Sequence, residues 1–127
     1  MIHQVRVIFG DTDQMGVVYY ANYLRYFEAA RAALLRSVGK SQRDLARLEI
    51  GFPVTEAHCR YRRPARYEDL LDVEVAVTSM RGASLEFRYE IRRDEEVLAD
   101  GYTVHACLSS RGRPVRIPAE LRELLAP

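Results

Sequence analysis

One long helical segment, residues 21–38, constrains the fold of this chain more than any other feature. Four alanines between positions 29 and 33 favour helix strongly. One face of the helix steps by three or four positions through Leu24, Phe27, Arg31, Leu34 and Val38, and Gly39 is a natural residue to end the helix. A helix with so much alanine and so few charges must be covered on most sides. The rest of the chain therefore has to build that cover.

Most of the remaining sequence alternates apolar and polar residues, which is typical of strands. Turn-favouring stretches at 81–82 and 93–95 separate neighbouring runs, so we expect an antiparallel meander. A run at 4–9 places Val5, Val7 and Phe9 on one face. Two small helices complete the pattern, one starting at a Ser41 cap and one following Pro118. The expected strands are residues 4–9, 52–62, 70–79, 85–92 and 97–108, with a last short strand near Val115.

This order of elements predicts an α+β fold, in which one long central helix is wrapped by a curved antiparallel sheet of about five strands. The 127 residues, 48% of them hydrophobic, suit a single domain spanning 1–127 with a real core. The outer face and the edges of such a sheet would invite a second subunit.

Composition and spacing argue against several other classes of protein. Nineteen basic residues face 18 acidic ones, so no global field favours nucleic acid or an anionic membrane. No apolar run approaches about 18 residues, and the first residues lack a signal-peptide pattern, so we expect a cytoplasmic protein without membrane insertion. Cys59 and Cys107 are expected to be buried thiols. His3, His58 and His105 lack metal-ligand spacing, so no metal site is expected.

Two acids, Asp11 and Asp13, stand between the first strand and the long helix. A turn around Gly16 follows them, and the helix begins near Asn22. Acidic turn residues often only bond their own backbone. Here, however, a carboxylate would lie close to free backbone N–H groups at a helix start, which can polarise a carbonyl. A carboxylate beside an oxyanion site is a working arrangement for a hydrolase.

The motif DTDQMGVVYYANYLRYFEAAR resembles the signature of hotdog-fold acyl-CoA thioesterases of the 4-hydroxybenzoyl-CoA thioesterase superfamily. It is most similar to the YbgC type, which is linked in many bacteria to the Tol-Pal system. The resemblance continues through RYRRPARYEDLLDVEV and TSMRGASLEFRYEI and fades after about Leu108. It implies the same fold, a long helix wrapped by a curved antiparallel sheet.

The resemblance also implies roles for individual residues. Asp13 matches the catalytic aspartate, and Asp11 and Gly16 match supporting positions. Tyr20 falls where the family places a backbone N–H on the thioester oxygen, although many YbgC-type members have histidine there. Asn22 is expected to cap or orient the helix start. The sequence leaves open whether Asp13 attacks the thioester as a nucleophile or activates water as a base.

Two groups of residues are candidates for binding the coenzyme A phosphates. Arg62 and Arg63 belong to a basic run that could equally be a solvated strand edge. Arg81 and Ser84 flank a glycine turn with free backbone N–H groups. Bulky rings around the helix start are expected mostly in the core, and those that line the acyl pocket would favour short or aromatic acyl groups.

The sequence thus predicts an acyl-CoA thioester hydrolase that needs no cofactor, because coenzyme A is part of its substrate. The resemblance implies a homodimer, with active sites at the subunit interface, that assembles to a tetramer. Acyl carrier protein in place of coenzyme A stays open. Two alternatives are a hotdog dehydratase, which usually needs a histidine-acid pair, and a non-catalytic module that binds acyl-CoA or a partner.

Overall fold

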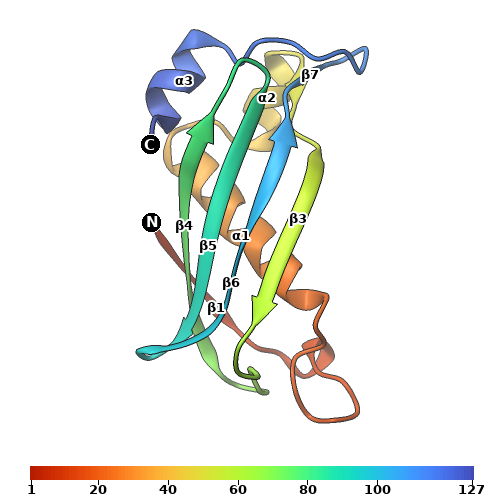
Figure 1. Cartoon of the computed structure of the whole chain (residues 1–127), viewed down its shortest axis with the longest axis vertical. Helices are drawn as coiled ribbons and strands as arrows, with labels where there is room; N and C mark the ends of the chain where they lie inside the picture. The colour runs from red at the N-terminus through yellow and green to blue at the C-terminus, as the bar shows by residue number, and fades with distance from the viewer.

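The computed structural model describes all residues 1–127 and contains one long helix enclosed by a five-stranded antiparallel sheet (Figure 1). The sheet order is β1-β4-β5-β6-β3, and every neighbouring pair is antiparallel. This confirms the predicted fold class. The elements are β1 (Ile2–Arg6), η1 (Phe9–Asp11), α1 (Asn22–Ser37), α2 (Gln42–Arg47), β2 (Ile50–Gly51), β3 (Val54–Tyr61), β4 (Leu70–Met80), β5 (Ser84–Arg93), β6 (Glu96–Ala106), β7 (Leu108–Ser109) and α3 (Ala119–Leu125).

Strands β4 and β5 each bury one face, as the alternation of their residues predicts. The core-facing residues of β4 and β5 are all buried, while the residues between them are exposed or half-buried. One face of the sheet therefore packs on α1 and the other is polar, which is the usual arrangement for an antiparallel sheet. The buried set is Leu71, Val73, Val75, Val77, Leu85, Phe87, Tyr89 and Ile91.

Helix α1 lies across the sheet with its aromatic residues inward. Phe27 stacks flat on Tyr89 of β5, with ring centroids 4.2 Å apart, and lies against Gly101 of β6. A Cβ at residue 101 would collide with the carbonyl oxygen of His58, so this close packing depends on glycine. The predicted inward face is partly wrong, because Leu24 is 38% exposed. The buried face is Tyr23, Tyr26, Phe27, Ala30, Ala33 and Leu35, since large rings gain more from burial than a single leucine.

The first strand ends earlier than predicted, at Arg6 instead of at residue 9. Val7 still bonds the backbone of the loop before β4, but the chain then turns into the short helix η1. The Asp11 carboxylate accepts the N–H of Ile8 at 3.2 Å and so closes this turn. Phe9, predicted to face the core, is consequently 75% exposed.

The smaller elements close one end of the molecule. Ser41 caps α2 through the N–H of Asp44, and Gly39 ends the preceding helical segment with a φ of 73°. Helix α3 follows Pro118 as expected. The short strand predicted near Val115 is reduced to a single antiparallel bridge between Pro114 and Leu108, flanked by the bond from the N–H of Val115 to Cys107. The strand partner of β7 is β2.

The two edges of the sheet differ in exposure. On β1 exposed and half-buried residues alternate, whereas on β3 seven of the eight residues are exposed. A strand exposed on both faces and unpaired along one edge is a typical site for association with another chain. None of the helices combines the length and apolar character that a membrane-crossing helix needs.

Candidate active site

A tight loop carries Asp13 between η1 and α1. Thr12 pairs with Val18, and the N–H of Asp13 bonds the carbonyl of Val17 at 2.9 Å. Gly16 donates to the carbonyl of Asp13 with a φ of 79°, a left-handed conformation that suits glycine. The loop thus forms a small hairpin with Asp13 at its start.

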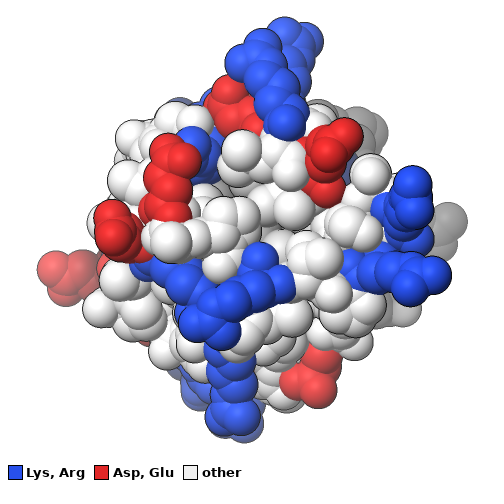
Figure 2. Space-filling view, turned by 90° about the horizontal axis from the view of Figure 1, so that it is seen from above, with Lys and Arg blue, Asp and Glu red and all other residues white.

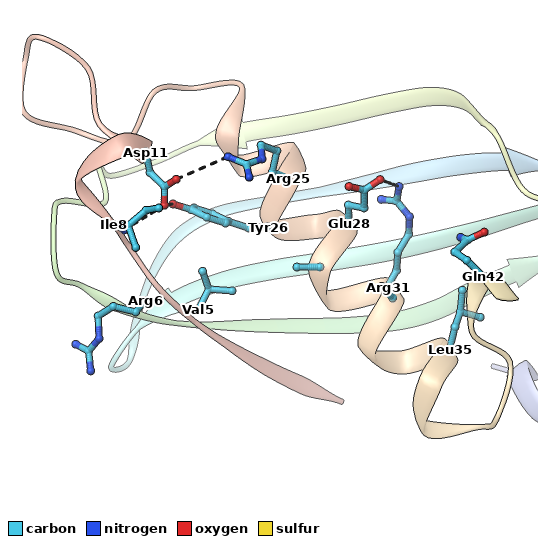
Figure 3. Close-up of a pocket in the computed structure, with 12 residues that line it drawn as sticks. Val5, Arg6, Ile8, Asp11, Arg25, Tyr26, Glu28, Arg31, Leu35 and Gln42 are labelled. Atoms are coloured by element: carbon cyan, nitrogen blue, oxygen red, sulfur yellow. Dashed lines mark hydrogen bonds and ion pairs between the residues drawn. The ribbon is translucent and has the colours of Figure 1, made fainter.

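The Asp11 side chain points away from this hairpin, into the space between β1 and α1 (Figure 3). It is buried, and Oδ2 accepts the hydroxyl of Tyr26 at 2.8 Å as well as the N–H of Ile8. Arg25 lies 3.8 Å from Oδ1. Asp11 is therefore fully engaged in holding η1 against the helix.

Asp13 has a different environment. Its side chain is half-buried, and Oδ1 accepts the N–H of Met15 at 2.8 Å, whereas Oδ2 takes part in no hydrogen bond. The residue lines a cavity of about 320 Å³ together with Tyr20 and Tyr23 of the helix start and the end of β3. One carboxylate oxygen is thus fixed and the other has no hydrogen-bond partner, on a residue that lines a cavity. The cavity residues are Asp13, Val17, Val18, Tyr20, Tyr23, Tyr61, Arg62, Arg63 and Pro64.

The start of α1 is held from two sides. The carbonyl of Asp11 accepts the N–H of Tyr19 and the side-chain amide of Asn22, both at 2.9 Å. Asn22 therefore orients the helix start by this bond; it does not cap it, since Ala21 occupies the N-cap. No hydrogen bond uses the N–H of Tyr20, which leaves this donor available.

Tyr61, at the end of β3, is a site residue that the sequence did not single out. Its hydroxyl donates to the carbonyl of Tyr20 at 2.9 Å, and its ring lies edge-on to Tyr20 and Tyr23. Burial raises the pKa of Tyr61 to about 12, so the hydroxyl stays protonated and able to donate. This bond ties the peptide after Tyr20 to the edge strand.

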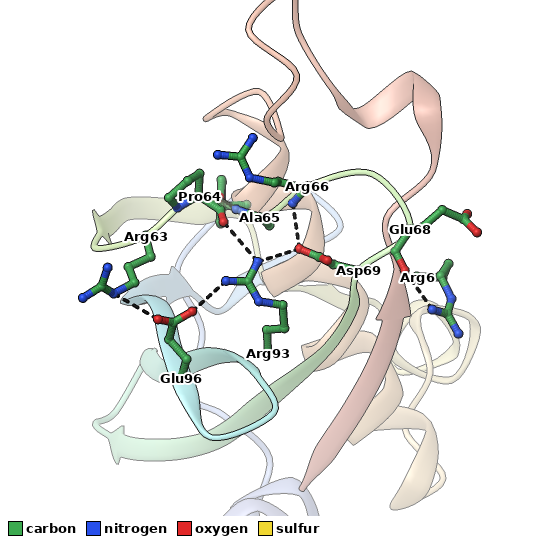
Figure 4. Close-up of polar contacts among 10 residues, drawn as sticks. Arg6, Arg63, Pro64, Ala65, Arg66, Glu68, Asp69, Arg93 and Glu96 are labelled. Carbon is green, nitrogen blue, oxygen red and sulfur yellow. Dashed lines mark hydrogen bonds and ion pairs between the residues drawn. The ribbon is translucent and has the colours of Figure 1, made fainter.

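Arg62 and Arg63 line the same cavity as Asp13, but both have acidic partners. Arg62 pairs with Asp100 at 2.6 Å, and Arg63 pairs with Glu96 at 3.1 Å. Glu96 in turn binds Arg93, which also binds Asp69 at 2.7 Å (Figure 4). A phosphate approaching these arginines would therefore compete with carboxylates already in place.

Arg81 and Ser84 are not brought to this cavity. Ser84 pairs with Ala106 at one end of β6, and Tyr61, which borders the cavity, pairs with Ala99 toward the other end. Ser84 and Tyr61 therefore lie toward opposite ends of the sheet. Seen from the end of the molecule that carries the β4–β5 turn, basic side chains lie near the centre and also at the rim, with acidic ones between them toward the rim (Figure 2). Within one chain, the four phosphate candidates thus form two separate pairs.

The histidines lie away from Asp13. His105 is buried in the core, where burial lowers its pKa, and its ring nitrogens contact the carbonyl of Phe52 and the hydroxyl of Thr103. His58, which could have approached the cavity, stacks on Tyr102 elsewhere on the sheet. No three histidine, cysteine or carboxylate side chains gather in a cluster that could hold a metal ion.

Comparison with known proteins identifies the family of this chain. Residues 7–125 match the model of the thioesterase-like superfamily. The acyl-CoA thioester hydrolase YbgC of Escherichia coli O6:H1 is 36% identical over 125 residues, covering 94% of this chain and 93% of the relative. A hypothetical protein of Thermus thermophilus superposes with a TM-score of 0.94 at 33% identity, covering 98% of this chain and 96% of that one. A gentisyl-coenzyme A thioesterase gives a TM-score of 0.89 at 26% identity, covering 96% and 99%.

Proposed function

This chain belongs to the thioesterase-like superfamily and has its hotdog fold, and on that premise we propose that it hydrolyses acyl-CoA thioesters. Water adds to the thioester carbonyl, the carbon–sulfur bond breaks, and the products are the free acid and coenzyme A. YbgC, the relative at 36% identity, is named for this reaction. The predicted family and enzyme class are thus confirmed.

The observation that carries the mechanism is the free oxygen of Asp13, a residue that lines a cavity together with Tyr20. An ionised carboxylate there can take a proton from water or attack the carbonyl carbon itself. The unbonded N–H of Tyr20 is suited to stabilise the oxyanion that develops. The thiolate of coenzyme A leaves readily, so the reaction needs no strong acid and no cofactor.

The tyrosines around Asp13 bear on the acyl group. The ring centroid of Tyr61 lies 6.3 Å from that of Tyr20 and 5.0 Å from that of Tyr23, and all three residues line the cavity. Flat aromatic walls favour a short or aromatic acyl group over a long chain. The structural relative named for gentisyl-CoA, which carries an aromatic acyl group, supports this choice.

Assembly is proposed from the edge strand β3. Its exposed residues and free backbone groups suit pairing with the same strand of a second copy, which would complete the cleft beside Asp13. Two such dimers would make the tetramer that the family resemblance implies. A cytoplasmic location, and acyl carrier protein as a substitute for coenzyme A, belong to the same proposal.

The dehydratase alternative receives no support from the cavity, because no histidine lines it beside Asp13. The non-catalytic alternative predicts binding of acyl-CoA without release of thiol. Incubating the purified protein with benzoyl-, hydroxybenzoyl-, hexanoyl- and palmitoyl-CoA, and following free thiol with a chromogenic reagent, separates these functions. We expect turnover with the compact acyl groups and little with palmitoyl-CoA. Binding of all four without thiol release would overturn the proposal.

A further inference from the structure

Arg31, on α1, is a charged residue in an unusual position. Its side chain is only 15% exposed, yet its two polar contacts are both long. Nη1 lies 3.5 Å from the hydroxyl of Tyr89, and Nη2 lies 3.6 Å from Glu28. A guanidinium has five N–H donors, and a largely buried one is costly unless it is closely paired. Arg31 therefore has unused capacity to bind an anion.

A directed chain of hydrogen bonds holds Arg31 in place. The guanidinium can only donate, to Tyr89, whose hydroxyl lies 2.6 Å from Thr103. Thr103 is 2.8 Å from Nε2 of His105, and Nδ1 of His105 is 2.9 Å from the carbonyl of Phe52, which can only accept. With a donor at one end and an acceptor at the other, every bond in the chain has one direction. The chain positions Arg31 from the core side and leaves its outer side free.

That outer side faces a cavity of about 520 Å³ between β1 and α1 (Figure 3). The volume is within the usual range for small-molecule sites. Arg31 also borders a second cavity of about 240 Å³ that reaches the start of β3. Neither cavity includes Asp13. The apolar residues of the larger cavity are Val5, Ile8, Tyr26, Ala29, Ala32 and Leu35.

The charges around this cavity select the kind of anion. Arg6 and Arg25 also line the cavity, but Arg6 is exposed and donates to the carbonyl of Glu68, and Arg25 is 72% exposed and lies beside Asp11. Two carboxylates line it as well: Asp11 is fully engaged, and Glu28, 71% exposed, is free to swing outward. Both would repel a doubly charged group such as phosphate more than a singly charged one. Apolar walls with one guanidinium that is both largely buried and loosely paired, that of Arg31, suit a carboxylate attached to an apolar body.

We infer that Arg31 and the cavity between β1 and α1 form a binding site for the carboxylate of a small apolar acid. The inference rests in part on the proposed function, because that reaction supplies such a group. The free acid released by hydrolysis in the Asp13 cavity would bind at this separate site as a product.

Calorimetric titration of an inactive Asp13→Asn protein tests the site apart from turnover. Hexanoate is the probe, with hexanamide as its neutral analogue and inorganic phosphate as the second anion. We expect hexanoate to bind at least 10-fold more tightly than either one. Adding Arg31→Met should weaken hexanoate binding about 10- to 100-fold, because a charge-assisted contact is lost. Equal affinity for the acid and the amide, or tighter binding of phosphate, overturns the inference.

Two further variants protect the test from a folding artefact. Arg25→Met removes an arginine that lines the same cavity but is 72% exposed and faces Asp11, so binding should change less than 3-fold. Glu28→Gln removes the competitor of Arg31 and should tighten binding several-fold. Tighter hexanoate binding in Glu28→Gln and weaker binding in Arg31→Met cannot both come from misfolding. Absence of the gain, or equal losses for the two arginine variants, contradicts the site.

Turnover by the protein with Asp13 intact separates this site from the proposed function. Added hexanoate should inhibit thiol release from hexanoyl-CoA by the parent protein, and that inhibition should be lost in Arg31→Met. Absence of any thiol release would instead reject the proposed function and leave the binding result standing.

Discussion

Asp11 and Asp13 are two residues apart, carry the same side chain, and have opposite surroundings. Asp11 is buried, accepts two hydrogen bonds on one oxygen and has an arginine near the other. Asp13 is half-buried, has one oxygen without a partner, and lines a separate cavity. The backbone changes between them from the short helix η1 to the hairpin that follows, and the two carboxylates consequently line different cavities.

The difference teaches how the fold keeps a reactive group free. Asp11 closes η1 with its carboxylate and holds Tyr19 and Asn22 with its carbonyl. Because Asp11 fixes the backbone, Asp13 needs only one hydrogen bond of its own to be positioned. The second oxygen of Asp13 then stays available for chemistry.

The largest expected effect is on turnover when Asp13 is changed. Asp13→Asn keeps the size of the side chain but removes its ability to act as a base or nucleophile. We expect kcat/KM to fall by about 100-fold or more, with the free energy of unfolding unchanged within about 0.5 kcal/mol. Thiol release and urea denaturation measure the two quantities. Full activity in this variant would contradict the catalytic role of Asp13 on which its contrast with Asp11 depends.

Asp11→Ala should show the reverse pattern, with stability as its main loss. Removal of the carboxylate leaves the hydroxyl of Tyr26 and the N–H of Ile8 without partners. We expect the free energy of unfolding to fall by about 3 kcal/mol. Asp13→Ala is the matched control, because it loses only the bond to Met15, and should cost about 1 kcal/mol or less. Equal losses in urea denaturation would show that the two acids do not differ as described.

The hairpin of Asp13 depends on the backbone of Gly16. Gly16→Ala meets no neighbouring atom, so its cost comes from the positive φ alone. We expect a loss of about 1 kcal/mol in unfolding free energy and a lower kcat. Gly10→Ala, equally open but without a positive φ, is the control and should change stability by less than about 0.5 kcal/mol.

The smallest expected effect is on folding stability at alkaline pH, and it involves Tyr26, the hydrogen-bond partner of Asp11. Burial and the hydrogen bond to Asp11 raise the pKa of Tyr26 above its ordinary value of about 10. Above that pH the unfolded chain loses the tyrosine proton first, so folding stability falls as pH rises. The fall measured by urea denaturation between pH 9 and 11 should be shallower in Tyr26→Phe. An identical slope would mean that this pair does not contribute.

The sequence was sufficient to predict features that depend on local pattern. The alternation of residues 70–92 placed the buried face of two strands correctly, and Ser41 and Pro118 marked the starts of two helices. The motif around Asp13 indicated the family that the comparison then confirmed. In each case the signal lies within about twenty residues of the feature.

What the sequence could not predict depends on partners far apart in the chain. Tyr61 contacts Tyr20 across 41 residues, and Arg31 reaches Tyr89 across 58. The buried face of α1 differs from the predicted one, because Tyr23 and Tyr26 are buried and Leu24 is not. Which side of the helix is buried depends on how the finished sheet curves round it. Phe9 was predicted to share a face with Val5 and Val7. The bond from the N–H of Ile8 to the Asp11 carboxylate turns the chain at this point, so Phe9 is exposed instead.

Gly101 carries a consequence for how this protein can evolve. The ring of Phe27 and the backbone of β3 meet above it with no room for a side chain. A saturation library at this codon should return a single surviving amino acid, even though no part of the proposed chemistry lies there. A deep mutational scan would thus flag residue 101 as intolerant purely for reasons of space.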